Sequence, residues 1–503
     1  MPSLALLAAT PRTVSVSLDA DRFAYMLDAA RTWRLSDADG RLIAEGETET
    51  VVFTLCGLTP QSHYRLDVDG ERLDFATRPE SLLIDITDCG ASPDGDDNAP
   101  AIQSAIDRLP PMGTVRIPAG TFHSSPIFLK SDMTLLLEEG AVLSAVADRS
   151  RYPILPARHT DGRVLGTWEG VAEPCFASLV TALDCRNLIL TGVGRIDGGG
   201  DRGDWWTWPK ETRQNARRPR TIFLSHGEAI ILSGITVCNS PSWTIHPVFC
   251  RHLIAAGLTI ENDPLSPNTD GFNPECSREI VLSGLHFSVG DDCIAIKAGK
   301  RDPKGGLDQP CEEIMVENCR MERGHGGVVI GSEMSGGVRN VTVRRCAMRD
   351  TDRGLRIKTR RGRGGVVEKI RLEDCVMTGV AVPLVVNSFY FCDSDGRSDY
   401  VQSRLPLPVT QATPVVRDIA VRNLVAENVG VAAAAFYGLP EAPITGITID
   451  GYRVGFDPDA VADVPDMACG FTPLRHGRII AENARIDRSA ALEFSPAPQS
   501  IAV

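Results

Sequence analysis

The chain has 503 residues and a formal net charge of −13, with 43% hydrophobic and 23% charged residues, 46 glycines and 33 prolines. This length exceeds one ordinary globular domain, so a second module or an elongated repeat architecture is expected. The acidic balance argues against a general nucleic-acid or anionic-membrane binder, which needs a basic face, and no apolar run approaches the roughly 18 residues of a membrane span.

The amino terminus carries a poor secretion signal. The apolar run Leu4 to Ala9 has no Lys or Arg before it, because Arg12 is the first basic residue. We therefore expect a cytoplasmic protein, or a periplasmic or secreted one if a signal has been removed. We also expect a monomer, with neither nucleic acid nor membrane as a partner.

Residues 1–80 are predicted to form a small β-sandwich. Short alternating strands broken by turns recur from Thr10 to Thr77, as in Tyr64-Arg65-Leu66-Asp67-Val68. The turn Leu58-Thr59-Pro60 followed by Tyr64 resembles the fibronectin type III module, in which a corner tyrosine follows such a turn. A structural spacer without activity is the simplest role for this domain.

Residues 81–503 are predicted to form a right-handed parallel β-helix, which makes the chain all-β. The apolar spacing of Ala99 to Leu109 predicts one amphipathic helix that caps the open end of a solenoid. Strand repeats of roughly 23 to 34 residues follow, with about 49 at one insertion, and no helical pattern interrupts them. Each repeat opens on a charged residue, in turn Glu228, Arg251, Arg278, Glu312, Arg339, Glu368 and Arg417.

Cysteines also recur in these repeats. Cys293, Cys319, Cys346 and Cys375 stand at similar places, which predicts stacked interior thiols rather than disulfides.

Aligning the repeats brings chemically active residues together. If Phe272, Ile294, Val328 and Leu355 form one inward column, with neighbouring rungs about 4.8 Å apart, an outward strip gathers charged residues from four rungs. The strip contains Asp270, Asp291, Asp292, His325, Arg356 and Lys358. In this alignment Lys297 shares a column with Lys358. His246 is placed in that column too, so a substrate contact is predicted for it.

Three carboxylates this close cannot all ionise without strain, so at least one pKa should rise. A neutral carboxylic acid beside ionised carboxylates suits glycosidic cleavage, which needs a proton donor and a base for water. A separation of roughly 6.5–9.5 Å leaves room for that water and implies inversion. Arg356 and Lys358 add fixed positive charge for a carboxylated sugar. Trp205, Trp206 and Trp208 are predicted either to stack on sugars or to pack a loop.

Four motifs resemble the signature of the polygalacturonases, glycoside hydrolase family 28. In order, they are Asn268-Thr269-Asp270-Gly271-Phe272, Gly290-Asp291-Asp292, Gly324-His325-Gly326 and Arg356-Ile357-Lys358. The resemblance implies an inverting hydrolase of galacturonic-acid polymers that needs no cofactor or metal. It makes Asp291 the general acid, lets Asp270 and Asp292 activate water, and gives His325 a supporting role. Substrate contacts are then expected from Arg356, Lys358, Asn268, His246 and Lys297.

Two positions depart from the family pattern. Asn273 follows Phe272 where many relatives carry an acidic residue, and Gly327-Val328-Val329-Ile330 replaces the more usual Ile-Ser-Ile run. Both departures leave the sugar preference open, including rhamnogalacturonan or a decorated galacturonan.

Two other functions are compatible with a solenoid of this kind. A pectate lyase would use the carboxylates as calcium ligands and eliminate rather than hydrolyse, and a noncatalytic carbohydrate-binding β-helix would have no need of clustered carboxylates. Within the hydrolases, exo action on polygalacturonate oligomers is preferred over endo action. The accessory sandwich, the missing signal and loop insertions at 299–310 and 389–414 favour it.

Overall fold

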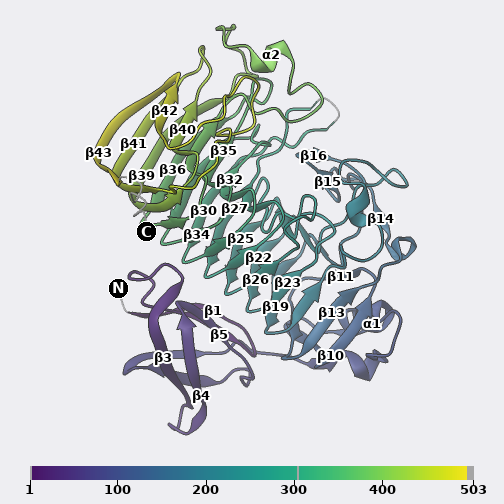
Figure 1. The fold of residues 1–503 in the computed structure, drawn as a ribbon. Helices are drawn as coiled ribbons and strands as arrows, with labels where there is room; N and C mark the ends of the chain where they lie inside the picture. The colour runs from purple at the N-terminus through teal and green to yellow at the C-terminus, as the bar shows by residue number, and fades with distance from the viewer. Residues whose placement is uncertain (1–2, 303–304, 496–503) are drawn as a thin grey trace.

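The structure is a computed structural model that describes residues 3–302 and 305–495. It consists of a small antiparallel β-sandwich beside a long right-handed parallel β-helix, so the predicted fold class is confirmed (Figure 1). Three short stretches lie outside the described residues. Two are the ends of the predicted domains, 1–2 and 496–503, and the third, 303–304, belongs to the first predicted insertion. Among the residues described, no helix is long and apolar enough to cross a membrane.

The N-terminal sandwich contains seven strands in two sheets. One sheet has the order β1 (Leu4–Ala9), β2 (Val14–Leu18), β5 (Val52–Leu55), and the other β4 (Leu42–Thr50), β3 (Met26–Asp37), β6 (His63–Val68), β7 (Glu71–Ala76). The Tyr64 hydroxyl accepts a hydrogen bond of 2.9 Å from the backbone N–H of Thr59. This bond forms the tyrosine corner that the sequence predicted.

A short cap closes the first end of the β-helix. After β7 the chain enters β8 (Leu83–Asp85), the 3-10 helix η1 (Ile86–Cys89) and helix α1 (Ala99–Arg108). The α1 side chains Ile102, Ala105 and Ile106 are buried in the solenoid core, so the predicted capping helix is confirmed.

Each rung of the β-helix contributes strands to three faces. The first face contains β9 (Gly113–Ile117), β12 (Met133–Leu137), β19 (Arg186–Gly192), β22 (Glu228–Ser233), β25 (Arg251–Ala256), β27 (Arg278–Ser283), β30 (Cys311–Glu317), β33 (Val338–Arg344) and β36 (Val366–Glu373). The second contains β10 (Gly120–Ser124), β13 (Ala141–Ala145), β20 (Arg195–Asp197), β23 (Thr236–Cys238), β26 (Thr259–Glu261), β28 (His286–Ser288), β31 (Arg320–Glu322), β34 (Ala347–Arg349) and β37 (Val376–Thr378). Long strands continue these faces as β39 (Val415–Val429), β41 (Ile444–Phe456) and β43 (Ala484–Ser495).

The third face carries the chemically interesting residues. Its strands are β11 (Ile127–Leu129), β18 (Val180–Leu183), β21 (Ile222–Ser225), β24 (Ile245–Val248), β29 (Asp292–Ile296), β32 (Gly326–Ile330), β35 (Arg353–Lys358), β38 (Val382–Asn387), β40 (Ala432–Tyr437) and β42 (Gly477–Glu482). Loops beside it contain η2 (Arg149–Arg151), β14 (Ile154–Leu155), β15 (Thr167–Trp168), β16 (Val171–Ala172), β17 (Cys175–Phe176), η3 (Trp205–Thr207) and α2 (Asp399–Gln402).

The register confirms the predicted inward column. Ile245, Phe272, Ile294, Val328 and Leu355 pair in succession, and each is buried. On the first face, the charged residues that open the repeats also stack directly, from Glu228 through Arg251 to Arg417. Opposite charges are neighbours at most steps of this stack, as in the 2.7 Å ion pair between Arg251 and Glu228, whereas Arg251 and Arg278 are adjacent like charges.

The cysteine prediction is confirmed for three residues, whereas the fourth, Cys293, is buried and free as predicted but is not stacked with them. Cys319, Cys346 and Cys375 share one buried column at the turn between the first and second faces, and all fourteen cysteines are free. Cys293 instead lies on β29, which belongs to the third face.

Candidate active site

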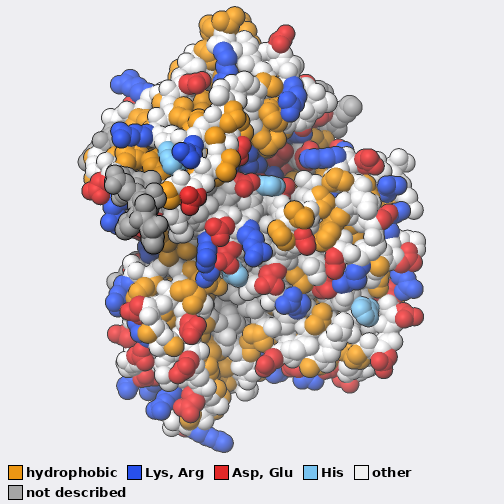
Figure 2. Space-filling view, in the orientation of Figure 1, with side chains coloured by type: hydrophobic (Ala, Val, Ile, Leu, Met, Phe, Trp, Pro, Cys, Tyr) orange, Lys and Arg blue, Asp and Glu red, His pale blue; other side chains and the backbone are white. Residues whose placement is uncertain are grey.

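Loops at both edges of the third face surround a polar cavity of about 590 Å³. Strands β29, β32 and β35 form its floor. Its walls contain Glu169 from the loop between β15 and β16, Tyr390 to Asp393 from the loop after β38, and Met467 from the loop between β41 and β42. In Figure 2 acidic and basic side chains gather in the hollow between the loops that contain β15 and β16 and the loops on the opposite, C-terminal side.

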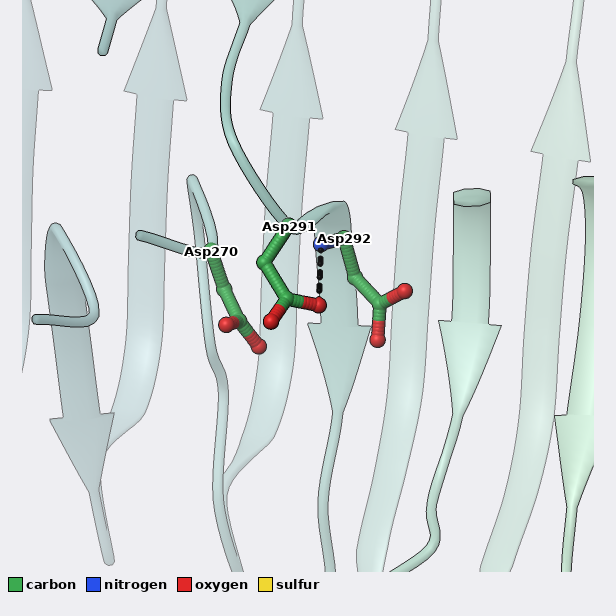
Figure 3. Close-up of side chains that lie close together, drawn as sticks. All are labelled: Asp270, Asp291 and Asp292. Carbon is green, nitrogen blue, oxygen red and sulfur yellow. Dashed lines mark hydrogen bonds between the residues drawn. The ribbon is translucent and has the colours of Figure 1, made fainter. Parts of the chain in front are cut away.

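Three aspartates lie at the centre of the cavity. Asp270 precedes Phe272, while Asp291 and Asp292 stand where β29 begins. One carboxylate oxygen of each lies within 4.8 Å of the others. Figure 3 shows Asp291 between the other two, with its Oδ1 accepting a 2.9 Å hydrogen bond from the backbone N–H of Asp292. Asp270 and Asp292 are buried and Asp291 is half-buried, so Asp291 is the carboxyl most open to a ligand.

This geometry confirms that the aspartates converge, at a separation that the sequence alone left open. Oxygens within 4.8 Å of one another fall below the roughly 6.5–9.5 Å that commonly separates the carboxyl groups of inverting enzymes. The separation alone therefore does not argue for inversion.

The two buried aspartates have opposite pKa shifts. Burial, followed by repulsion from Asp291, raises the pKa of Asp270 to about 8. Burial also disfavours ionisation of Asp292, but Lys358 and Arg356 outweigh it and hold the pKa of Asp292 below its ordinary value. The expected rise in one carboxyl pKa is thus confirmed. It falls on Asp270, whereas the family resemblance assigns the donated proton to Asp291.

Two lysines compensate the carboxylates. Lys358 Nζ donates to Asp292 Oδ2 at 2.7 Å. Lys297 Nζ lies 3.8 Å from Asp270 Oδ2 and 3.1 Å from Glu333 Oε2. Because Ile296, Ile330 and Ile357 pair in succession, the lysines that follow the first and last of them share a column, as predicted. Both lysines line the cavity.

Arg356 also lines the cavity and stands in one column with Ala295 and Val329. Its Nη2 lies 2.5 Å from Asp466 Oδ1, whereas its Nη1 is 3.8 Å from Asp292 Oδ1. The guanidinium is thus directed to a residue 110 positions downstream. Arg356 and Lys358 also flank the ring of Tyr390, each 5.4 Å from its centroid.

His325 lies beside Asp291, because its backbone N–H donates to the Asp291 carbonyl at 3.1 Å. Its Nδ1 is 2.8 Å from Asp352 Oδ2. This side-chain hydrogen bond raises the pKa of His325 to about 9, so the ring is mainly an imidazolium at neutral pH. Asn268 also lines the cavity, held by a 2.7 Å hydrogen bond from Arg218 Nη2 to its Oδ1.

The predicted substrate contact by His246 is wrong in this structure. His246 follows Ile245, which pairs with Phe272, so His246 belongs to the column of Ala295 and Arg356 rather than that of Lys297. Its side chain is 0% exposed, with Nε2 3.0 Å from Glu275 Oε2 and Nδ1 accepting from Arg220 Nε at 3.2 Å. It is a buried structural residue below the cavity.

The tryptophan loop packs on itself. Trp205 and Trp208 are 1% and 0% exposed and contact Tyr152 and Phe176, so the loop-packing alternative holds for both residues. Trp243, which follows Ser242 in the chain, is the tryptophan that lines the cavity.

Several cavity residues were missed by sequence reasoning. They are Glu169, Lys210, Glu333, Asp352, Asp393 and Met467, together with the Arg356 partner Asp466. Glu333 was the easiest to find, because it follows the β32 strand by three positions at the edge where Lys297 emerges. Asp352 could also have been found, because it stands three positions before Leu355, as His325 does before Val328. The remaining residues lie in irregular loops whose length carries no register.

The oxygens of the aspartate trio are also close enough together to hold a metal ion, and the trio is the group of which this is true among the described residues. Two features count against calcium as a resident ion. Lys358 already neutralises Asp292, and Lys297 and Arg356 add positive charge within 3.8 Å of the trio. A divalent cation would meet this charge at close range.

Comparisons with known proteins agree with this site. The family described as Glycosyl hydrolases family 28 matches residues 159–451. A "Probable polygalacturonase" of Vitis vinifera is 31% identical over 402 residues, 77% of this chain and 78% of its own. An "Endo-polygalacturonase" of Pectobacterium parmentieri is 32% identical over 305 residues, 58% of this chain and 71% of its own. The crystal structure of a hyperthermoactive exopolygalacturonase from Thermotoga maritima has a TM-score of 0.66 and 26% identity, covering 82% of this chain and 91% of that one.

Because the family match spans more than half of the chain and contains all four motifs, the chain belongs to the glycosyl hydrolases of family 28.

Proposed function

We propose that this protein hydrolyses the α-1,4-galacturonosyl bonds of polygalacturonate oligomers and acts from a chain end. One observation carries the proposal. The aspartate trio shares a cavity with Lys297, Arg356 and Lys358. A bond between uronic acids needs both groups, the carboxyls for proton transfer and water activation and the cations for the sugar carboxylate.

The proposed roles follow from exposure and charge. Asp291 protonates the leaving oxygen, because it is the carboxyl of the trio that is only half-buried. Asp270 holds a proton within 4.8 Å of Asp291 and can resupply it. Asp292 stays ionised and accepts a proton from the attacking water, for which its Oδ1 has no competing hydrogen bond among the described residues. His325, as an imidazolium, supports the negative charge that Asp291 acquires.

Arg356 and Lys358 are proposed to bind the galacturonate carboxylate. Both are nearly buried on the cavity floor, and the Arg356 Nε has no partner among the residues described. Fixed, partly desolvated cations of this kind bind carboxylates more strongly than flexible surface cations do. Lys297 and Asn268 are proposed to contact the neighbouring part of the sugar.

Exo action is supported by the walls at both ends of the cavity. At the C-terminal end, the Phe391 N–H donates to the Met467 carbonyl at 3.3 Å, which joins two loops across the third face. Toward the N-terminal end, Lys300 N donates to the Gly170 carbonyl at 3.0 Å, and Lys210 pairs with Glu169. A closed pocket accepts the end of a polymer more easily than its middle. The relatives include both endo and exo enzymes by name, so the mode belongs to the proposal.

Product analysis tests the proposal. Wild-type protein is incubated with tri- and hexagalacturonate and with long polygalacturonate, and products are followed by anion-exchange chromatography and viscosity. We expect monomer or dimer release with slow viscosity loss, and a kcat reduced by about 10²–10⁴-fold in Asp291→Asn. Proton NMR of the first product should show the β-anomer, the mark of inversion at an α-linkage.

Each part of the proposal has its own contrary result. Early viscosity loss would replace exo by endo action, and an initial α-anomer would contradict inversion. Unsaturated, ultraviolet-absorbing products that disappear with a chelator would indicate a lyase. Binding without reducing-sugar release, unaffected by Asp291→Asn, would indicate a noncatalytic β-helix.

A further inference from the structure

A short segment near the C-terminus completes the cavity wall. We call Val464–Met467 the strap; it lies between β41 and β42, beyond residue 451 where the family match ends. Arg353 fixes its first half, with Nε donating to the Pro465 carbonyl at 2.5 Å and Nη2 to the Val464 carbonyl at 3.0 Å. Met467 O accepts from Asn387 Nδ2 at 3.0 Å. The strap is therefore held by strand β35 of the cavity floor and by the neighbouring strand β38.

Within the strap, Asp466 is directed at Arg356. Its side chain is 0% exposed. Its Oδ1 lies 2.5 Å from Arg356 Nη2, and its Oδ2 accepts from Asn387 Nδ2 at 3.1 Å. Arg356 Nη1 donates to the His325 carbonyl at 3.4 Å. These bonds fix the plane of the guanidinium and leave its Nε facing no partner among the described residues.

The same contact keeps Arg356 away from Asp292. The distance of 3.8 Å between Arg356 Nη1 and Asp292 Oδ1 is too long for a hydrogen bond. Asp292 Oδ1 is buried and has no hydrogen-bond partner in the described part of the chain. Without the Asp466 carboxylate, Asp292 would be the nearest strong acceptor for Arg356. The pairing with Asp466 thus leaves Asp292 Oδ1 and Arg356 Nε, both buried in the cavity floor, without a hydrogen-bond partner among the described residues.

We infer that Asp466 is a positioning residue, which holds Arg356 in the orientation that binds the substrate carboxylate and prevents it from closing on Asp292. The inference rests on the proposed hydrolysis of galacturonate oligomers. It makes a segment outside the family match a working part of the site.

The test is a double-mutant cycle between Asp466→Asn and Arg356→Lys, with kcat and KM measured on trigalacturonate. Asp466→Asn keeps the shape of the side chain but removes its charge and leaves one acceptor oxygen in place of the two that face Arg356 and Asn387. We expect it to lower kcat/KM on the order of 10- to 100-fold, because misplacing a binding group by about 1 Å costs that much. In the Arg356→Lys background the same substitution should have almost no further effect. Asp459→Asn, an exposed position in the same loop, serves as the matched control.

Other outcomes are distinguishable. An Asp466→Asn protein as active as Asp459→Asn overturns the inference. Equal losses in both Arg356 backgrounds, accompanied by a lower thermal midpoint, also overturn it, because Asp466 would then support the wall rather than Arg356. If the double variant is too slow to assay, the cycle is measured as trigalacturonate dissociation constants in an Asp291→Asn background. A wild-type protein inactive on galacturonates would instead refute the proposed function itself.

Discussion

Asp270 is a carboxyl group in an environment that opposes its ionisation. Burial and the neighbouring Asp291 raise its pKa to about 8. Its pKa in the unfolded chain is near 3.9, so the folded protein loses stability relative to the unfolded chain as the pH rises from about 4 to about 8. We predict that Asp270→Asn raises the thermal midpoint at pH 7.5, has little effect at pH 4, and abolishes most activity. If the thermal midpoint of Asp270→Asn at pH 7.5 equals that of the wild type, Lys297 already compensates the negative charge of Asp270.

His325 has the opposite linkage. Its pKa is raised to about 9, first by the hydrogen bond to Asp352 and then by Asp291. The stabilisation it contributes is fully present below pH 6.5 and is lost as the pH rises through about 9. We predict that Asp352→Asn returns the His325 pKa toward 6.5, measured by NMR titration of the imidazole. A His325 that still titrates near 9 in the variant would assign the shift to Asp291 and Asp292 instead.

At the scale of the element, the stacked columns connect stability with the site. Ile294 lies on β29 between Asp292 and Lys297 and is fully buried against Phe272 and Val328. We predict that Ile294→Ala lowers the free energy of unfolding by about 2–5 kcal/mol, because it leaves a cavity that the neighbouring rungs cannot fill. Urea denaturation measures this loss. Val376→Ala, at a side chain that is 44% exposed, is the control and should change stability by less than about 0.5 kcal/mol.

The elements also show how far a sequence pattern reaches. The inward column from Phe272 to Leu355 was predictable because alternation distinguishes core from solvent. The column of His246 was predicted wrongly because a slip of two residues keeps every side chain on its face and leaves the pattern unchanged. Its true register appears only in the pairing of Ile245 with Phe272. Sequence spacing also misplaced Cys293. Its distance along the chain to the next cysteine resembles that between the stacked cysteines, although it lies on another face.

At the scale of the whole molecule, the walls that the loops form around the cavity could not be predicted from the sequence pattern. The insertion at 389–414 was predictable, but its contact with the strap was not, because Phe391 and Met467 are separated by long irregular segments. Asp466 was missed for the same reason, since a loop that has no strand register brings it to the site. Asp352, by contrast, directly precedes β35 in the column of His325, so the alignment of the repeats could have found it. The four motifs supplied the central carboxylates and cations, and tertiary contacts supplied their partners.

The sandwich is attached to the β-helix at a distance from this chemistry. Asn318, in the turn between the first and second faces, donates through Nδ2 to the carbonyls of Ala20 and Phe23 at 3.0 and 2.7 Å. Its φ of 52° is tolerated by glycine, so Asn318→Gly removes the contact without backbone strain.

We predict that Asn318→Gly destabilises the protein by about 1–3 kcal/mol, because two acceptors at a buried interface lose their donor. Its kcat should stay unchanged, since the cavity opens on the third face. Thermal unfolding and trigalacturonate hydrolysis measure the two effects. Asn340→Gly is the matched control, because Asn340 has a φ of 55° but donates to Glu313 instead of the sandwich. A lower kcat in Asn318→Gly alone would mean that the sandwich influences the site through the rungs, and its role as a spacer would have to be abandoned.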